Sequence, residues 1–242
     1  MVTSALLDAA LIARTVSVDE ISGGGDVILL APHPDDETLG CGGAIAALSD
    51  KGRRVQVIVI TDGGHSHPVS TAYPRDRLCS LRQNEVRSAL HILTQGHGPV
   101  PIMLGFPDND APDGDAAALR TAEIIQAHIN GETALWTTWA GDPHPDHGRT
   151  SRIAAEVARR NPRLSIWSYP IWGRFNHGDT TFDRDCLVRL DTEPWQHRKS
   201  AAVTAHATQM SGLISDDPGG FRMDDALQDH FITTPELFLK GL

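Results

Sequence analysis

The sequence has few cysteines and few basic residues. Its 242 residues include 3 cysteines, Cys41, Cys79 and Cys186, none of them in a CxxC pair. That is poor material for a disulfide framework or a thiolate zinc site, and it suits a reducing compartment. The 21 Lys and Arg residues stand against 31 Asp and Glu residues, a formal net charge of −10. This charge argues against nucleic acid or an anionic membrane surface as a partner, because both attract basic proteins.

Membrane and export signals are missing as well. No run of about 18 apolar residues occurs, so we expect no membrane insertion. The N-terminal stretch MVTSALLDAALIARTVSVDE lacks a basic start, and Asp8 interrupts its short apolar run. It therefore differs from a signal peptide, and we expect a cytoplasmic protein.

Two common catalytic signatures are also absent. Gly40, Gly42 and Gly43 do not follow the GxGxxG order of a dinucleotide-binding turn, and a Pro-His-Pro turn stands where its first glycine belongs. We expect these glycines to permit close contact between a helix and the sheet. No G-x-S-x-G elbow occurs, which argues against a serine hydrolase.

What the sequence does contain is a regular alternation of apolar runs and segments of helical period. Strands are predicted at 26–32, 53–64, 100–110, 132–139 and 163–172, and helices at 37–52, 81–93, 115–130 and 148–160. Strands followed by helices in this way are typical of an α/β protein, with a mostly parallel sheet and helices on both faces. The continuous apolar runs indicate strands buried on both faces.

After about Gly173 the alternation weakens. A strand at 186–192, a helix at 195–210 and a polar, glycine-containing loop at 211–225 are predicted there. No composition shift marks a boundary, so we expect a single domain over 1–242. Its core would span about 27–170, and the C-terminal part, 171–242, would complete a site.

Functional residues are expected at one edge of this sheet. In open α/β sheets, sites form beyond the carboxyl ends of the strands. Four loops leave such ends, with the sequences PHPDDE, TDGGHSH, FPDND and AGDPHPDHGRT. Each of the four carries acids, histidines or both.

Two HPD motifs carry the strongest chemical signal. In HPDD and HPDH, a histidine is followed three residues later by a second potential ligand, and in the first turn of a helix such residues share a face. Nitrogen and carboxylate ligands without thiolate suit Zn²⁺ or another first-row divalent ion, and three protein ligands plus water are typical of a catalytic site. The candidates are His33, Asp35, Asp36, His144 and His147. These five candidates exceed the three ligands that a catalytic metal needs, so the others could act as a base and an oxyanion stabiliser in hydrolysis.

Structural explanations exist for some of these residues. An acid of the HPDD motif could cap the following helix while His33 packs against the sheet. His65 and His67 in GGHSHP are interpreted as polar loop residues rather than ligands. The presence of two HPD motifs after two different strands favours the metal site over capping.

At these residues the chain resembles the PIG-L/LmbE-like family of zinc-dependent N-acetylglucosaminyl deacetylases. The first family motif is similar to APHPDDETLGCGG, residues 31–43, and the second to HPDH, residues 144–147. The resemblance extends over about 27–239 through the segments ITDGG, LRQNEVRSALHIL with Arg82 and Glu85, LGFPDND, KSAAVTAHATQ and PELF.

The resemblance implies a Rossmann-like fold and a set of residue roles. Zinc would be held by His33, Asp36 and His147. Asp35 would be the general base, ionised beside the metal. His144, oriented by Asp146, would stabilise the oxyanion as an imidazolium and protonate the leaving amine. Arg82 and Asp108 match positions that contact sugar hydroxyls in family members, and three residues of the KSAAVTAHATQ segment would border the site: Lys199, His206 and Gln209.

The implied substrate is a small-molecule N-acyl amino sugar, such as an N-acetylglucosaminyl conjugate, and family members are often homo-oligomers. The mycothiol-pathway branch has a Tyr where this chain has Asp142, so we expect no Tyr-assisted proton transfer from this loop. Two alternatives stay open. One is an amidase acting on a non-sugar or secondary-metabolite N-acyl amine, with a pocket shaped by Trp172, Phe175, Trp195 and the SDDPGGF loop. The other is a non-catalytic metal- or sugar-binding homologue.

Overall fold

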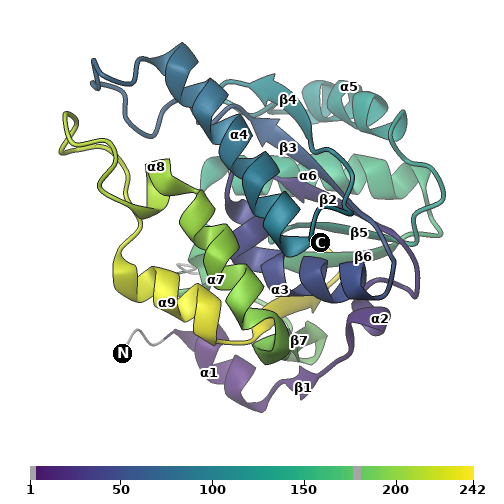
Figure 1. Cartoon of the computed structure of the whole chain (residues 1–242). Helices are drawn as coiled ribbons and strands as arrows, with labels where there is room; N and C mark the ends of the chain where they lie inside the picture. The colour runs from purple at the N-terminus through teal and green to yellow at the C-terminus, as the bar shows by residue number, and fades with distance from the viewer. Residues whose placement is uncertain (1–3, 177–180) are drawn as a thin grey trace.

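A single eight-stranded sheet runs through the molecule (Figure 1). The computed structural model describes residues 4–176 and 181–242. The strand order is β1-β7-β8-β6-β5-β2-β3-β4, and among the strands of these described residues only β8 runs antiparallel to its neighbours. The strands are β1 (Arg14–Thr15), β2 (Val27–Ala31), β3 (Val55–Thr61), β4 (Ile102–Phe106), β5 (Ala134–Thr138), β6 (Ser165–Tyr169), β7 (Leu187–Leu190) and β8 (Glu236–Lys240). The predicted α/β class with a mostly parallel sheet is confirmed.

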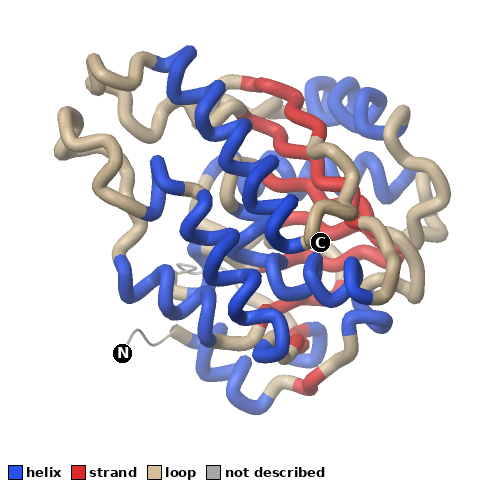
Figure 2. Tube along the Cα trace, in the orientation of Figure 1, coloured by secondary structure: helices blue, strands red, loops and turns tan. Residues whose placement is uncertain are grey.

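Helices cover both faces of the sheet, as predicted. The helices α3 (Asp36–Asp50), α4 (Arg75–Leu93) and α7 (Gln196–Ala205) pack together on one face, and α5 (Asp115–Gln126) and α6 (Pro145–Arg160) on the other. Figure 2 shows the strands enclosed between these two layers. The remaining helical segments are α1 (Ala5–Ile12), α2 (Val18–Ile21), α8 (Ala207–Met210), α9 (Asp225–Thr233) and the 3-10 turns η1 (Trp172–Arg174), η2 (Arg184–Cys186) and η3 (Glu193–Trp195).

Strand β2 shows why its sequence is apolar throughout. Successive side chains of a strand point to opposite faces. Leu29 and Ala31 join the cluster beneath α3, α4 and α7, whereas Ile28 and Leu30 join the cluster beneath α5 and α6. Every residue of the strand is buried, so a polar alternation would place polar atoms in one of the two cores.

Glycines allow α3 to lie close to the sheet, as the sequence predicted. A Cβ on Gly40 would stand 2.4 Å from the Tyr169 ring, which is too close for any larger residue. The Tyr169 hydroxyl donates to the backbone oxygen of Leu30 at 2.9 Å, so this ring also links β6 to β2. The start of α3, and with it the HPDD motif, is thereby fixed against the strand it follows.

Several boundaries differ from the sequence prediction. Helix α4 begins at Arg75, six residues before the predicted start at 81, because its first three residues are charged and exposed and Leu78 is its first buried residue. The helix predicted at 195–210 is divided at His206, whose backbone leaves the helical region between α7 and α8. β8 and the N-terminal elements α1, β1 and α2 were not predicted as elements. Within the described residues, no helix has the length and apolar character needed to cross a membrane.

Candidate active site

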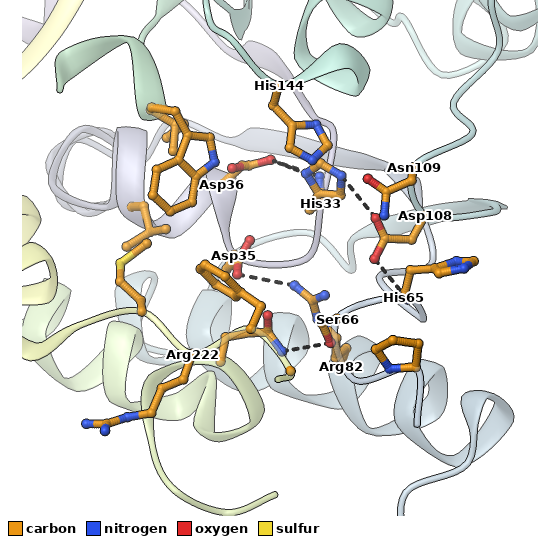
Figure 3. A pocket seen from close by; sticks show the side chains of 18 of the residues that line it. His33, Asp35, Asp36, His65, Ser66, Arg82, Asp108, Asn109, His144 and Arg222 are labelled. Carbon is orange, nitrogen blue, oxygen red and sulfur yellow. Dashed lines mark hydrogen bonds and ion pairs between the residues drawn. The ribbon is translucent and has the colours of Figure 1, made fainter. Parts of the chain in front are cut away.

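The polar loops that follow β2, β3, β4 and β5 meet at one edge of the sheet. Together with η1 and the loop after α8 they line a cavity of about 560 Å³. Figure 3 shows His33, Asp36, His144 and Asp108 close together in this cavity, with Asp35 and Arg82 pointing toward each other beside them. The prediction that these loops share one edge is confirmed.

The turn between β2 and α3 presents its acids in an unusual backbone conformation. Asp35 has a φ of 151°, in the region that normally favours glycine. Such conformations cost free energy and persist where the surrounding structure holds them. Here the Asp35 backbone N–H donates to Glu37 Oε2 at 3.1 Å, and Arg82 Nη2 donates to Asp35 Oδ2 at 3.2 Å. The carboxylates of Asp35 and Asp36 can therefore point in different directions although the two residues are neighbours in sequence.

The structure brings together the three residues predicted as ligands. Asp36 Oδ2 lies 3.2 Å from His33 Nδ1 and 3.3 Å from His147 Nε2. Two donors on one tetrahedral zinc ion, each about 2.0–2.1 Å from it, lie roughly 3.3 Å apart. All three side chains are buried or nearly so. These two separations and the donor types fit a divalent ion. Among the described residues, the groups of three donors that all lie within 4.8 Å of one another contain His33 but not Asp36.

The environment of His147 supports the same fit. Its ring is fully buried, and within the described part of the chain neither nitrogen makes an aligned hydrogen bond. Each nitrogen nevertheless faces a carboxylate oxygen, Asp36 Oδ2 or Asp142 Oδ1, at 3.3 or 3.2 Å. Buried polar atoms normally have hydrogen-bond partners. Ring nitrogens of His147 without an aligned hydrogen bond are therefore available to bind a metal ion.

Other donors surround the same histidines. The donor atoms of His33, His144 and His147 lie within 4.8 Å of one another, and so do those of His33, Asp108 and Asp146. His33 Nε2 is 3.3 Å from Asp108 Oδ1 and 3.2 Å from Asp146 Oδ2. His33 therefore presents one ring nitrogen to each of two acidic groups, and the metal-ligating potential of this edge exceeds the predicted triad.

Charge interactions within the cluster are strong. Burial disfavours the charged form of His33, but hydrogen bonds to Asp108, Asp146 and Asp36 outweigh it and raise its pKa well above the usual value. Burial likewise opposes charge on His147, yet Asp36 and Asp142 raise its pKa to about 9. The same contacts hold the pKa of Asp36 well below its usual range despite burial. The carboxylates of this cluster thus stabilise positive charge at its centre.

Asp35 differs from its neighbour. Burial raises the pKa of Asp35 to about 7, an effect that Arg82 opposes and Asp36 reinforces. A carboxylate with a pKa near neutrality suits proton transfer better than one with an ordinary value. The sequence predicted an ionised Asp35, and that state depends on a nearby cation to lower this pKa.

His144 differs from the sequence prediction of an imidazolium. Burial and the positive charge of His33 and His147 lower the pKa of His144 to about 4, which favours the neutral ring. Its Nδ1 accepts a hydrogen bond of 3.2 Å from the backbone N–H of Asp146, so the proton of the neutral ring lies on Nε2. His144 can therefore act as a neutral hydrogen-bond donor.

Asp146 was expected to orient His144, and it does so through its backbone. Its carboxylate instead accepts hydrogen bonds from the backbone N–H groups of Asn109 and Ala111 at 2.9 and 3.1 Å, and from Arg149 Nη1 at 2.9 Å. The side chain thus joins the β4 loop to the start of α6. The sequence did not distinguish the role of the Asp146 backbone, which contacts His144, from that of its carboxylate, because both belong to one residue.

Asp142 is a functional candidate that the sequence analysis missed. Its Oδ1 lies 3.2 Å from His147 Nδ1, and its Oδ2 accepts hydrogen bonds from the backbone N–H groups of Ile171 and Gly173 at 2.9 and 3.0 Å. A carboxylate that holds the second nitrogen of a ligating histidine fixes the ring's orientation. The sequence signal was its place in the AGDPHPDH loop, noted only as a departure from Tyr.

The remaining candidates divide between the cavity and the core. Arg82 lines the cavity, but its guanidinium also donates to the backbone oxygens of Pro34 and Gly63 at 2.8 and 2.9 Å. Asp108 and His65 line it too, joined by a hydrogen bond of 3.0 Å from the His65 N–H to Asp108 Oδ2. Residues that were expected near the site but lie outside the cavity lining are Phe175, Trp195, Lys199 and His206, whereas Trp172, Gln209 and part of the SDDPGGF loop do line it.

Comparison with known proteins agrees with this arrangement. A sequence model of the PIG-L family, described as GlcNAc-PI de-N-acetylase, matches residues 28–158. A 1D-myo-inositol 2-acetamido-2-deoxy-alpha-D-glucopyranoside deacetylase of Corynebacterium efficiens is 27% identical over 233 residues, covering 78% of this chain and 75% of the relative. A probable N-acetyl-alpha-D-glucosaminyl L-malate deacetylase 2 of Bacillus cereus is 25% identical over 205 residues, covering 83% and 90%.

Among solved structures, the A40926 pseudoaglycone deacetylase Dbv21 shares the fold. It superposes with a TM-score of 0.65 at 20% identity, covering 90% of this chain and 97% of that one. The matched family segment runs from β2 through most of α6 and so includes both HPD motifs and the loops between them. This chain belongs to the PIG-L family, described as that of GlcNAc-PI de-N-acetylase.

Proposed function

We propose that this protein is a metal-dependent deacetylase that removes an N-acetyl, or another N-acyl, group from an amino sugar such as an N-acetylglucosaminyl conjugate. One observation carries the proposal. His33 and Asp36 line the same cavity as Asp35 and His144, and Asp36 Oδ2 lies 3.2 Å from His33 Nδ1 and 3.3 Å from Nε2 of the buried His147. The family membership and the names of the two relatives support the same reaction.

We propose zinc as the ion, held by His33, Asp36 and His147. Imidazole and carboxylate donors in tetrahedral spacing suit it, although other first-row divalent ions share this preference. When bound, such an ion lowers the pKa of a water molecule and polarises an amide carbonyl.

The protein's own groups then handle the protons. Arg82 holds Asp35 Oδ2, so that Oδ1 takes a proton from the attacking water. The Nε2–H of His144 donates a hydrogen bond to the carbonyl oxygen as negative charge develops there. A carbon–oxygen bond forms first as water adds to the carbonyl carbon. The carbon–nitrogen bond then breaks as the proton taken from the water passes to the departing amine. The products are a free amine and a carboxylic acid.

Asp108, Asn109 and His65 supply a polar wall for sugar hydroxyls. Asp108 and Asn109 follow β4, and His65 follows β3, so two loops contribute to this wall. Figure 3 shows the three side by side next to His33. In this proposal both Asp108 and Arg82 contact the sugar. Arg82 does so through the part of its guanidinium that faces the cavity.

The test is acetate release by purified protein from a panel of N-acetylglucosaminyl conjugates and of non-sugar N-acetyl amines. The proposal expects release from the sugar conjugates. Release from the non-sugar amines alone would replace it with the amidase alternative. No release from any compound by a metal-loaded protein would leave only a binding function.

The Asp142→Asn substitution should weaken metal binding about 10–100-fold. An asparagine offers one oxygen, so it cannot both face His147 Nδ1 and accept hydrogen bonds from the backbone N–H groups of Ile171 and Gly173, as the two carboxylate oxygens do. The expected result is a lower zinc affinity in competition with a chelator, with activity recovering at saturating zinc. Unchanged zinc affinity would remove Asp142 from the site. Asp113→Asn is a matched control, because Asp113 is exposed and pairs with Arg149 and Arg152.

We also propose a reducing, cytoplasmic location. All three cysteines lie in described residues and all are free. Cys41 is buried within α3, where burial raises the pKa of its thiol well above the usual value. Unpaired cysteines of this kind are typical of proteins in reducing compartments.

A further inference from the structure

One wall of the active-site cavity is apolar. Leu39, Ile171, Trp172, Phe221 and Met223 line it. The Trp172 and Phe221 rings meet edge to face, with centroids 5.8 Å apart at 88°. Leu39, Ile171 and Met223 are buried behind the rim, whereas Phe221 is 36% exposed. An exposed aromatic ring at the mouth of a cavity has surface available to a ligand.

The loop that carries Phe221 is held in place by side chains outside the catalytic cluster. Asp216 accepts hydrogen bonds from Ser70 Oγ and from the backbone N–H groups of Thr71 and Ala72, at 2.7–2.9 Å. The backbone N–H of Val69 donates to Asp217 Oδ2 at 3.0 Å. These contacts tie residues 211–224 to the loop between β3 and α4, and Figure 1 shows the two segments side by side.

Closer to the cavity, the same loop is fixed by its backbone. The Phe221 N–H donates to the Ser66 oxygen at 2.7 Å, and the Met223 N–H donates to the Gln209 oxygen at 2.8 Å. A Cβ on Gly220 would lie 2.2 Å from the His67 ring, so only glycine permits this approach. The position of Phe221 is therefore determined by contacts on both sides of it.

Trp172, on the other side of the pair, is fixed through Asp142. The Asp142 carboxylate binds the backbone N–H groups of Ile171 and Gly173, the two residues that flank Trp172. The same carboxylate faces His147. The backbone of both aromatic residues thus has a defined place relative to the catalytic cluster.

The cavity consequently has two unlike walls. His65, Asp108 and Asn109 offer polar groups on one side, and the aromatic pair offers apolar surface on another. A substrate made only of sugar hydroxyls would leave the apolar surface in contact with water, whereas a substrate with an apolar substituent would cover it. Aromatic side chains contribute a large area and defined geometry to such contacts.

We propose that the substrate is an amino sugar carrying an apolar group, and that Trp172 and Phe221 are the residues that select it. This inference rests on the proposed deacylation. The apolar group could be attached at either end of the sugar, as an alkyl or aryl aglycone or as the acyl chain itself. Both present the same chemistry to the aromatic pair, and separate substrates distinguish them.

The experiment compares kcat/KM for three substrates: N-acetylglucosamine, hexyl N-acetylglucosaminide and N-hexanoylglucosamine. Wild-type protein should prefer one hexyl-bearing substrate over N-acetylglucosamine by about tenfold or more, the scale of selectivity that apolar pockets provide. The preferred one identifies which end carries the apolar group. Phe221→Ala should reduce this preference about tenfold, because kcat/KM falls further for the hexyl-bearing substrate than for N-acetylglucosamine. Val100→Ala, at a 73% exposed residue away from the cavity, is the control.

Two failures are distinguishable. Equal kcat/KM for all three substrates, or a Phe221→Ala effect equal on all three, overturns the selection by the aromatic pair and leaves the deacetylase intact. Absence of turnover on every substrate overturns the proposed function. In that case equilibrium binding of hexyl N-acetylglucosaminide decides the apolar subsite: tighter binding than N-acetylglucosamine, weakened by Phe221→Ala, supports it, and equal binding overturns it.

Discussion

The Asp35→Asn protein should bind metal as the wild type does but release acetate about 10²–10⁴-fold more slowly, the contribution expected of a general base. An asparagine keeps the shape of the side chain and an oxygen for Arg82, but its amide cannot accept the proton of water. Asp35 is 6% exposed and lies beside Asp36 rather than among the donors of the metal cluster, so the metal site should be retained. The measurement is kcat together with zinc content.

Asp229→Asn is a matched control, because Asp229 is exposed on α9 and lies outside the cavity lining. It should retain wild-type kcat. An Asp35→Asn protein with full zinc and undiminished kcat would exclude Asp35 as the base. Loss of zinc from the same variant would instead assign Asp35 to the metal site.

The largest expected loss of stability concerns a buried ion pair away from the site. Lys199 Nζ lies 2.6 Å from Glu236 Oε1, and both side chains are almost completely buried. Glu236 also accepts hydrogen bonds from the backbone N–H groups of Gly43 and Ala44 at 2.7 and 2.9 Å. The carboxylate therefore joins β8, α7 and the middle of α3. Removing one partner of a buried pair typically costs about 3–5 kcal/mol, because the other charge is left without compensation.

Lys199→Met should lower the free energy of unfolding by about that amount. Adding Glu236→Gln should restore part of the loss, since the glutamine is neutral and keeps an acceptor for α3. Urea unfolding measures both. Lys51→Met, which breaks an exposed pair with Asp19 of 2.9 Å, should cost only about 0–1 kcal/mol. A Lys199→Met protein as stable as the Lys51→Met protein would show that the buried pair contributes little.

Much of the fold was predictable because buried parallel strands leave a direct signal. The apolar run of β2 and the runs of β3 and β5 have few polar residues, and each is followed by a segment of helical period. β8 gave a weaker signal, because Glu236, a charged residue in its first position, is accommodated by its pairing with Lys199 and by hydrogen bonds from the backbone of α3. That pairing joins residues distant in sequence and cannot be inferred from either segment alone.

In the site too, local sequence patterns were predictable and contacts between distant residues were not. His33 with Asp36, and His144 with His147, are spaced by three residues, so local helix geometry indicated that each pair shares a face. Asp142 acts through contacts with η1 and with a histidine held by the next helix, which only the folded chain creates. The neutral state of His144 depends on burial and on neighbouring positive charge, and neither can be inferred from a motif.

The loop at 211–225 is the clearest example of a feature whose position could not be predicted from the sequence. The sequence indicated a polar loop that covers a site. Its position depends on hydrogen bonds that the Asp216 and Asp217 carboxylates accept from residues 144–148 positions earlier in the sequence. Such contacts carry no periodic or spacing signal. The structure was therefore needed to place Phe221 opposite Trp172.

The most direct test of the central claim is a zinc add-back titration. Protein is stripped with a chelator, and acetate release from an N-acetylglucosaminyl conjugate is followed as zinc is returned. We expect no release from the stripped protein and full recovery at one zinc ion per chain, with no recovery in Asp36→Ala. Undiminished release from protein shown to be free of metal would contradict it.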